Sequence, residues 1–307
     1  MVRTARPLLS CRRITVLVVA TLLGAACGRS RLAEPGDLAT AAERGGRPDA
    51  TWRHDALWDD GRAEFCVYAV DWRRYGNLYP GRVLTVLVKE PWAPDLGVKA
   101  DRPRADGFDV LKLNLVRDVP TGIYTYHQTA SVYFRRDSGS IVKIAATSSE
   151  ACGISTALLE HGRLETHSYF DGEGDRDLAF PAGAVPEDGL PALLRDYVRG
   201  EPPPALAVFP MLLMGRYPSL APVTYAVSQR ALEGLEVPAG RFEAVEIELR
   251  AGDRSLAYAF EAAPPFRLLR FRMSDGTEYR LAKAERLRYW EMHAPGDEAW
   301  LPEHLRQ

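Results

Sequence analysis

The chain has 307 residues, 46% of them hydrophobic, which is enough to build a substantial buried core. Its 39 basic and 41 acidic side chains give a formal net charge of −2, and loss of the four arginines in residues 1–26 would change it to 35 − 41 = −6. This acidic balance argues against nucleic acid or anionic lipid headgroups as the main partner.

Residues 1–26 have the features of a bacterial signal peptide. Four arginines accompany an apolar stretch over residues 14–23, which is too short to span a bilayer. Small residues then precede Cys27, so we expect cleavage before Cys27 and attachment of lipid to its thiol. The mature protein would be anchored to the cell envelope by this lipid, outside the cytoplasm. Cleavage one residue away would instead leave it free in the periplasm.

Two further features concern export. Arg12 and Arg13 form a pair that leaves twin-arginine export open beside the general route for unfolded chains. Gly28, rather than an aspartate, follows the cysteine and fits sorting to the outer membrane, facing the periplasm, in a cell with two membranes. Residues 27–50 are rich in Gly, Ala, Arg and Pro without a repeating period, and we interpret them as a flexible tether.

Cys66 and Cys152 are the two cysteines of the body that follows. An extracytoplasmic location favours a disulfide between them, and two free thiols are the alternative. The chain has no Cys-x-x-Cys pair, which argues against a thiol oxidoreductase.

The first half of the body, residues 51–200, reads mainly as strands. A continuous apolar run at residues 83–88 is typical of a strand buried on both faces, whereas leucines alternate with polar residues over residues 110–116. We expect Tyr79-Pro80-Gly81 to form a turn. The expected strands are residues 63–70, 82–89 and 110–116, with hairpins formed by 123–135 with 141–147 and by 154–160 with 164–170.

One stretch of the body, residues 186–199, has the apolar spacing of a helix, with Gly200 as a stop. The prolines of residues 201–204 mark a boundary before a second half at 201–295 and a tail at 296–307. In residues 242–250, Val, Ile and Leu alternate with charged residues, which predicts a strand with one dry face. Residues 208–214 read as a strand or a cavity wall, and further strands are expected at 255–261, 267–273 and 277–281.

These patterns predict a mainly β fold: a curved antiparallel sheet or incomplete β-barrel, in two halves, with one or two short helices. Most aromatic side chains of such a sheet should fill its core. If the sheet curls without closing, a minority would line a cleft for an apolar ligand. The candidates are Phe209, Met211, Met214, Tyr225, Tyr258 and Phe260.

An acidic loop offers a second candidate site. Carboxylates recur at alternate positions at Asp171, Glu173, Asp175 and Asp177. Hard cations such as calcium prefer several carboxylate oxygens, so the loop suggests a metal site. The loop lacks the glycine and glutamate positions of an EF-hand, and a solvated turn is the alternative.

Two further patterns are weaker. His161, Glu165 and His167 have the residue types of a zinc site but lack a fourth ligand, and surface histidines are the alternative. Ser155 follows a Gly-Ile pair that resembles a nucleophile elbow, yet a nucleophile elbow joins a strand to a helix and strands are expected on both sides here.

Short motifs in the second half carry a resemblance. Residues 237–244 (Val-Pro-Ala-Gly-Arg-Phe-Glu-Ala), 263–265 (Ala-Pro-Pro) and 275–276 (Asp-Gly) resemble those of an uncharacterised family of secreted bacterial proteins, over about residues 171–290. The resemblance implies a curved, incomplete β-barrel akin to periplasmic lipoprotein carriers. Residues 110–116 and 121–124 look like larger bacterial lipoproteins sometimes labelled septum-formation inhibitors. That label transfers no catalytic residues, because the phosphate-handling region of the cytoplasmic enzyme has no counterpart here.

The expected function is therefore that of a non-enzymatic envelope lipoprotein that binds or carries a hydrophobic ligand on a concave sheet, without a cofactor. Two alternatives remain open. One is a structural or assembly lipoprotein that binds an envelope protein partner, and the other is a metal-dependent hydrolase that uses the acidic loop at residues 171–177.

Overall fold

The computed structural model describes Leu38 and residues 43–306, all within one compact unit, Leu32–Gln307. The predicted signal peptide, Cys27 and most of the tether lie outside the described residues. None of the helices in the described part of the chain combines the length and the apolarity that a membrane span requires.

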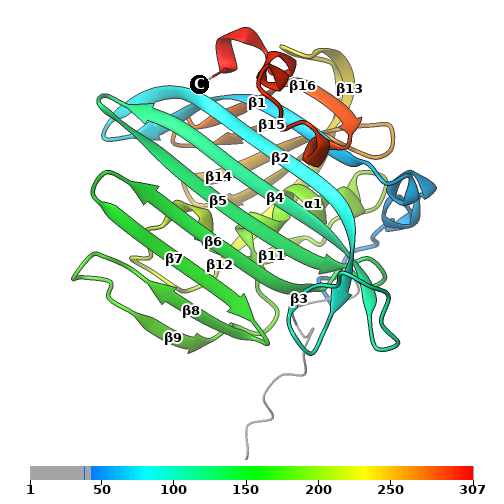
Figure 1. Ribbon diagram of the computed structural model, residues 1–307, viewed down its shortest axis with the longest axis horizontal. Coiled ribbons are helices and arrows are strands. Elements are labelled where there is room, and N and C mark those ends of the chain that lie inside the picture. The colour runs from blue at the N-terminus through cyan, green and yellow to red at the C-terminus, as the bar shows by residue number, and fades with distance from the viewer. Residues whose placement is uncertain (1–37, 39–42, 307) are drawn as a thin grey trace, which may run out of the picture. The chain divides into compact units, whose positions relative to one another are not determined.

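A single curved sheet of sixteen strands dominates the described residues, which confirms the predicted mainly β fold (Figure 1). The strands, in chain order, are β1 (Ala63–Arg74), β2 (Asn77–Ala93), β3 (Val98–Lys99), β4 (Phe108–Thr121), β5 (Tyr124–Arg135), β6 (Ile141–Glu150), β7 (Gly153–Glu160), β8 (Arg163–His167), β9 (Arg176–Ala179), β10 (Val185–Pro186), β11 (Ala205–Phe209), β12 (Val223–Val237), β13 (Gly240–Ala251), β14 (Arg254–Glu261), β15 (Leu268–Met273) and β16 (Glu278–Leu287).

The order of the strands shows that the sheet is not closed. It runs from β10 through β11 to β16, then through β1, β2 and β4 to β9, with β3 beside β2. The two edge strands, β9 and β10, are neighbours in the chain, so residues 180–184 connect the two edges. Every pairing is antiparallel except that of β10 with β11. The sheet also continues across the boundary predicted at residue 200, because β10 precedes it and β11 follows it.

The alternating pattern of residues 110–116 has the predicted effect. In β4, Leu111, Leu113 and Leu115 are buried in the main core, while Lys112 and Asn114 alternate with them on the other face. The hairpins of β5 with β6 and of β7 with β8 also form as expected.

The turn predicted at Tyr79-Pro80-Gly81 is wrong, because these residues lie inside β2. The chain turns instead at Tyr75 and Gly76, both of which have positive φ, as a two-residue hairpin requires. Pro80 is tolerated because β2 pairs only with β1 at this point, so the strand needs no hydrogen bond from Pro80 on its other side.

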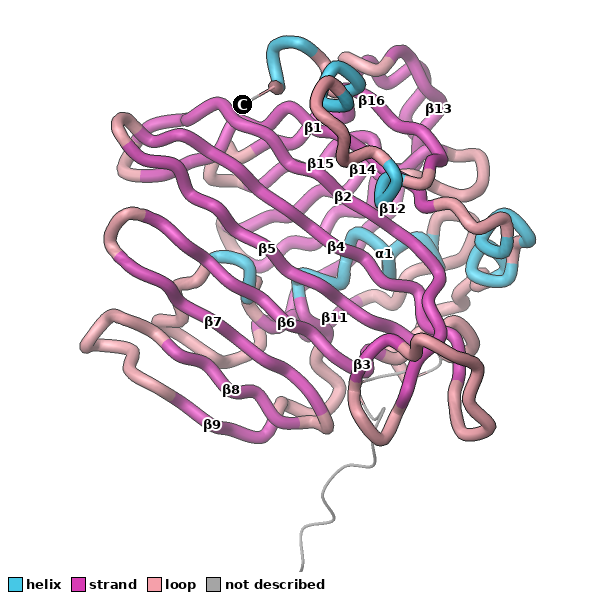
Figure 2. The backbone as a smooth tube through the Cα atoms, in the orientation of Figure 1, coloured by secondary structure: helices cyan, strands magenta, loops and turns pink. Residues whose placement is uncertain are grey.

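The helix predicted over residues 186–199 is also shorter than expected. Three successive elements occupy the region: the 3-10 helix η3 (Glu187–Gly189), a single α-helical turn α1 (Leu190–Leu193) and the 3-10 helix η4 (Leu194–Tyr197). Residues 184–198 are buried on all sides, not along one face, and the segment lies on the concave side of the sheet (Figure 2). Tertiary burial rather than helical amphipathicity therefore holds this segment in place.

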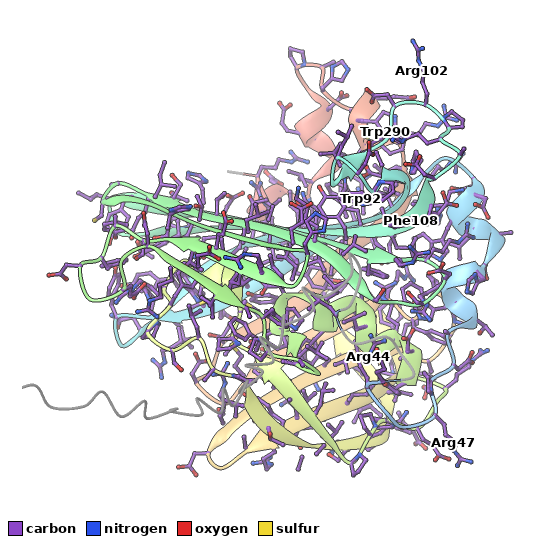
Figure 3. All side chains as sticks on the ribbon, turned by 90° about the horizontal axis from the view of Figure 1, so that it is seen from below. Arg44, Arg47, Trp92, Arg102, Phe108 and Trp290 are labelled. Atoms are coloured by element: carbon purple, nitrogen blue, oxygen red, sulfur yellow. The ribbon has the colours of Figure 1, made fainter. Side chains whose placement is uncertain are left out.

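Other short helices border the sheet. They are η1 (Thr51–His54), η2 (Ala56–Asp59), η5 (Leu212–Met214), η6 (Tyr289–Glu291), η7 (Asp297–Trp300) and η8 (Glu303–Leu305). The predicted tail is packed: the Trp300 ring lies 5.3 Å from the Phe65 ring of β1. Figure 3 shows Trp290 on one side of the sheet and Arg44 on the other, where Arg44 donates a 2.8 Å hydrogen bond to Asp196 in η4.

Candidate functional site

Side chains of the protein itself fill most of the concave side of the sheet. Four of the six residues predicted to line a ligand cleft are core residues, each at most 1% exposed: Phe209, Tyr225, Tyr258 and Phe260. That part of the prediction is wrong, because residues 184–198 occupy the space that an open cleft would need. The other two, Met211 and Met214, are partly exposed and line a pocket.

This pocket has a volume of about 460 Å³, which lies within the range of small-molecule sites. It lies at the end of the sheet where β15 turns into β16. Three strand residues line it from the concave face: Trp72 of β1, Arg117 of β4 and Tyr279 of β16. Each stands at a position whose side chain the alternation of the strand directs to that face. Loop residues 210–219, the turn at residues 273–277 and the pair Glu187 and Arg254 form the rest of the wall.

Arg117 is the buried basic residue of the pocket wall, and it is only 1% exposed. Its Nε donates a 2.8 Å hydrogen bond to Gln128 Oε1, and its Nη1 donates one of 2.9 Å to the Tyr279 hydroxyl. The guanidinium also lies 4.4 Å from the centre of the Trp72 ring, a cation–π contact. These neutral partners hold the guanidinium in one orientation at the pocket wall.

Gln128 links Arg117 to the neighbouring strands. Arg117 and Gln128 are direct cross-strand partners between β4 and β5, and Gln128 in turn faces Ser148 on β6. The amide of Gln128 donates hydrogen bonds to Ser148 Oγ at 2.9 Å and to the Met214 carbonyl at 3.2 Å. A polar row therefore crosses this part of the concave face and contacts η5.

Asp188 fixes η5 over this row. Its two carboxylate oxygens accept hydrogen bonds from the backbone N–H groups of Leu212, at 2.7 Å, and Leu213, at 2.9 Å. Burial nevertheless raises the pKa of Asp188 to about 6. The short helix that carries Met214 is thus held by one buried carboxylate.

Glu187, next to Asp188 in the chain, is a buried acid that lines the pocket, and it is 1% exposed. Burial raises the pKa of Glu187 to about 7, although Arg254 at 2.8 Å acts in the opposite direction. The side chain of Arg254 is 42% exposed, so this ion pair connects the interior to the pocket mouth.

The rest of the lining is mainly apolar. Three of the five methionines of the chain, Met211, Met214 and Met273, line the pocket together with Trp72 and Tyr279. Methionine is flexible and polarizable, and it suits surfaces that must adapt to an apolar partner. The pocket thus combines an adaptable apolar wall with one buried cation.

The structure does not support the predicted metal site. Glu173 is buried and engaged: it accepts hydrogen bonds from Arg216 Nε at 2.7 Å and from the backbone N–H of Tyr217 at 2.9 Å. The remaining acids of the loop do not converge on it, since Asp177 pairs with Arg163, Asp175 lies 3.2 Å from His167, and Asp171 is exposed. Within residues 43–306, no group of three or more ligand side chains is arranged to hold a metal ion.

The other candidate residues are also separated or buried. His161 lies in the β7–β8 turn, away from the end of β8 where His167 lies, and Glu165 stands opposite Asp177 on β9. Ser155 is an interior residue of strand β7, 1% exposed, and not the exposed apex of a strand-to-helix turn.

The predicted disulfide is absent. Cys66 is buried within β1, whereas Cys152 is exposed in the turn between β6 and β7, and both thiols are free.

Sequence reasoning did not identify Arg117 or Gln128 as site residues, although a signal was present. The alternation of Leu111, Leu113 and Leu115 continues to position 117, which puts an arginine on the dry face. Gln128 likewise stands at one of the alternate positions of β5 whose side chains are buried. A charged or amide residue at an inward position of a regular strand therefore marks a polar feature of the interior.

Comparisons with known proteins give little further information. No protein-family model matches the chain, and no curated protein matches it. Among solved structures, it is similar to a β-barrel-like protein of domain of unknown function DUF1849 from Brucella abortus, with a TM-score of 0.39 and 11% sequence identity. The similarity covers 74% of this chain and 98% of that one.

Proposed function

We propose that the protein is a non-enzymatic lipoprotein of the cell envelope that binds a hydrophobic molecule in the pocket lined by Met211, Met214 and Met273. The observation that carries the proposal is this pocket, in which methionine side chains remain accessible at the end of an otherwise filled concave face. The resemblance of residues 171–290 to carrier-like secreted proteins is a second, independent support.

The envelope location rests on the signal peptide and Cys27. It is tested by growing cells with an alkyne-labelled fatty acid and comparing the wild-type protein with Cys27→Ser. We expect label and membrane association in the wild type and neither in the variant. Cys152→Ser, which removes an exposed cysteine of the folded body, is the matched control and should keep the label. An unlabelled wild-type protein in the cytosol would contradict the proposed location.

Ligand binding is tested by native mass spectrometry of protein extracted from its own envelope. We expect additional mass from a bound hydrophobic molecule, and loss of that mass in Met211→Trp, where a larger side chain would fill the pocket. Val223→Trp, at an exposed position outside the lining residues, is the control and should retain the ligand. A bare mass in every preparation would count against ligand binding and favour the second candidate, an assembly role with a protein partner.

A further inference from the structure

Arg117 brings a positive charge into the pocket without a carboxylate in direct contact. Among the described residues, no carboxylate oxygen lies within 4.0 Å of its guanidinium, and its hydrogen-bond partners are Gln128, Tyr279 and Met214. An arginine side chain keeps its charge in proteins. Glu187 and Asp188, whose pKa values burial raises and Arg117 lowers, act on the guanidinium only from beyond ion-pair distance. A buried charge is costly unless it is paired, so the pocket holds a cation that lacks a direct partner.

The donors of Arg117 are also not all used. A guanidinium has five N–H groups, and the described residues account for four hydrogen bonds: two to Gln128, one to the Tyr279 hydroxyl and one to Met214 Sδ. The thioether is a weak acceptor that a stronger one can displace. One N–H group is therefore free and a second is weakly engaged, both in a residue that lines the pocket.

The two other arginines that line the pocket already have carboxylate partners. Arg254 pairs with Glu187 at 2.8 Å, and Arg216 pairs with Glu173 at 2.7 Å. Both arginine side chains are more than 40% exposed, so solvent screens them. Arg117 is thus the deep arginine without a carboxylate in contact, whereas Arg254 and Arg216 form partly exposed ion pairs. Asp275 also lines the pocket, where it accepts a hydrogen bond from the backbone N–H of Thr277.

We propose that the pocket takes a single-chain amphiphile with an anionic head, which binds with the head against Arg117 and the chain along Trp72 and Met273. The inference rests on the proposed binding function and specifies the chemistry of the ligand. An anion at this position would neutralise the buried charge and form charge-assisted hydrogen bonds, which are strong in a desolvated site. A fatty carboxylate and the phosphate of a single-chain lipid share this chemistry.

The test is calorimetric titration of the purified full-length protein, after removal of bound lipid, with four ten-carbon compounds below their micelle concentrations. They are decanoate, decyl phosphate, decan-1-ol and decyltrimethylammonium. We expect at least one of the two anions to bind roughly ten- to hundredfold more tightly than the alcohol, and the cation to bind most weakly. The anion that binds more tightly distinguishes a carboxylate from a phosphate ligand.

Variants then assign the preference to one side chain. Arg117→Met should reduce the affinity for the preferred anion at least tenfold and leave the affinity for decan-1-ol within about twofold. The matched control is Arg250→Met, which removes an exposed arginine of β13 outside the pocket and should change neither affinity. If Arg117→Met fails to fold, Met211→Trp in the wild-type background should abolish binding of the anion and the alcohol together.

The outcomes separate the two proposals. Equal binding of decanoate, decyl phosphate and decan-1-ol would overturn the anionic-head inference and leave hydrophobic ligand binding intact. An unchanged anion preference in folded Arg117→Met would also overturn it. No binding of any compound, together with a bare mass of the native protein, would contradict the proposed function itself.

Discussion

Arg195 of η4 and Glu64 at the start of β1 form an ion pair with an Nη2–Oε1 distance of 2.7 Å, and both side chains are at least 96% buried. A second donor, Nη1, contacts the other carboxylate oxygen at 3.3 Å and the Pro265 carbonyl at 3.1 Å. This pair joins the buried segment at residues 184–198 to β1. The first strand of the chain, β1, lies in the sheet between β2 and the last strand, β16. The ion pair therefore helps to keep the concave side filled.

Glu64→Gln should lower the free energy of unfolding by about 3–5 kcal/mol, because it leaves the Arg195 charge buried without a carboxylate. Glu64→Gln combined with Arg195→Met should recover much of this loss, since the unpaired charge is then removed. Chemical denaturation measures both. Arg250→Met breaks an exposed pair with Glu248 and should cost no more than about 1 kcal/mol. An equal, small effect of Glu64→Gln and Arg250→Met would contradict the structural role of the buried pair.

Gly215 ends η5 with a φ of +65° and lies against Ser148, so that a Cβ atom at this position would overlap the Ser148 side chain. Gly215→Ala should therefore displace η5 and Met214 from the pocket, in addition to the backbone strain of about 1–2 kcal/mol. Gly252→Ala, at φ +57° in an open turn, carries the same strain without the overlap and is the matched control. We expect thermal unfolding to show a larger loss for Gly215→Ala. Equal losses in the two variants would contradict the close packing of η5.

The strand pattern could be predicted from sequence wherever one face is wet. Leu111, Leu113 and Leu115 alternate with polar residues because β4 has one dry face, and the register follows directly from this period. The sequence favours a turn at Tyr79-Pro80-Gly81 over the actual turn at Tyr75 and Gly76, because Tyr79-Pro80-Gly81 has the stronger turn composition. Positive φ at a tyrosine is rare, and it is stabilised here by tertiary contacts of the Tyr75 hydroxyl with the Tyr126 hydroxyl.

The pocket could be predicted only in part, because its shape depends on a segment without a regular period. Residues 184–198 contain Glu187, Asp188, Arg195 and Asp196, four charged side chains that composition places at the surface. Each is buried because a partner from a distant part of the chain meets it, as Glu64 meets Arg195. Such pairs do not follow from local spacing, so the sequence pattern predicts neither the filling of the concave side nor the small pocket at its end.

The two body cysteines should differ sharply in reactivity. Cys152 is exposed, whereas Cys66 is buried, and burial raises the pKa of the Cys66 thiol to about 12. In a variant that lacks Cys11 and Cys27, we expect a thiol reagent to label one cysteine in the native protein and two after unfolding. Cys152→Ser should remove the native labelling and Cys66→Ser should not. No labelling in either state without a reductant would indicate a disulfide and contradict the structure.

Stability should fall as the pH rises from about 4 to 7, because of Glu187 and Asp188. Burial raises the pKa of Glu187 from 4.5 to about 7 and that of Asp188 from 3.8 to about 6. Between the ordinary and the raised values the folded protein holds more protons than the unfolded chain, so a rise in pH favours unfolding, and the loss is complete above pH 7.

Glu187→Gln should therefore reduce the difference in unfolding free energy between pH 5 and pH 8 by about 2 kcal/mol, since one pKa unit corresponds to roughly 1.4 kcal/mol. Denaturant titrations at the two pH values measure this difference. Glu248→Gln, which changes a partly exposed glutamate on β13 and leaves Glu187 in place, is the control and should keep the wild-type pH dependence. A wild-type protein that becomes more stable between pH 5 and pH 8 would show that Glu187 is charged in the fold, with Arg254 outweighing its burial.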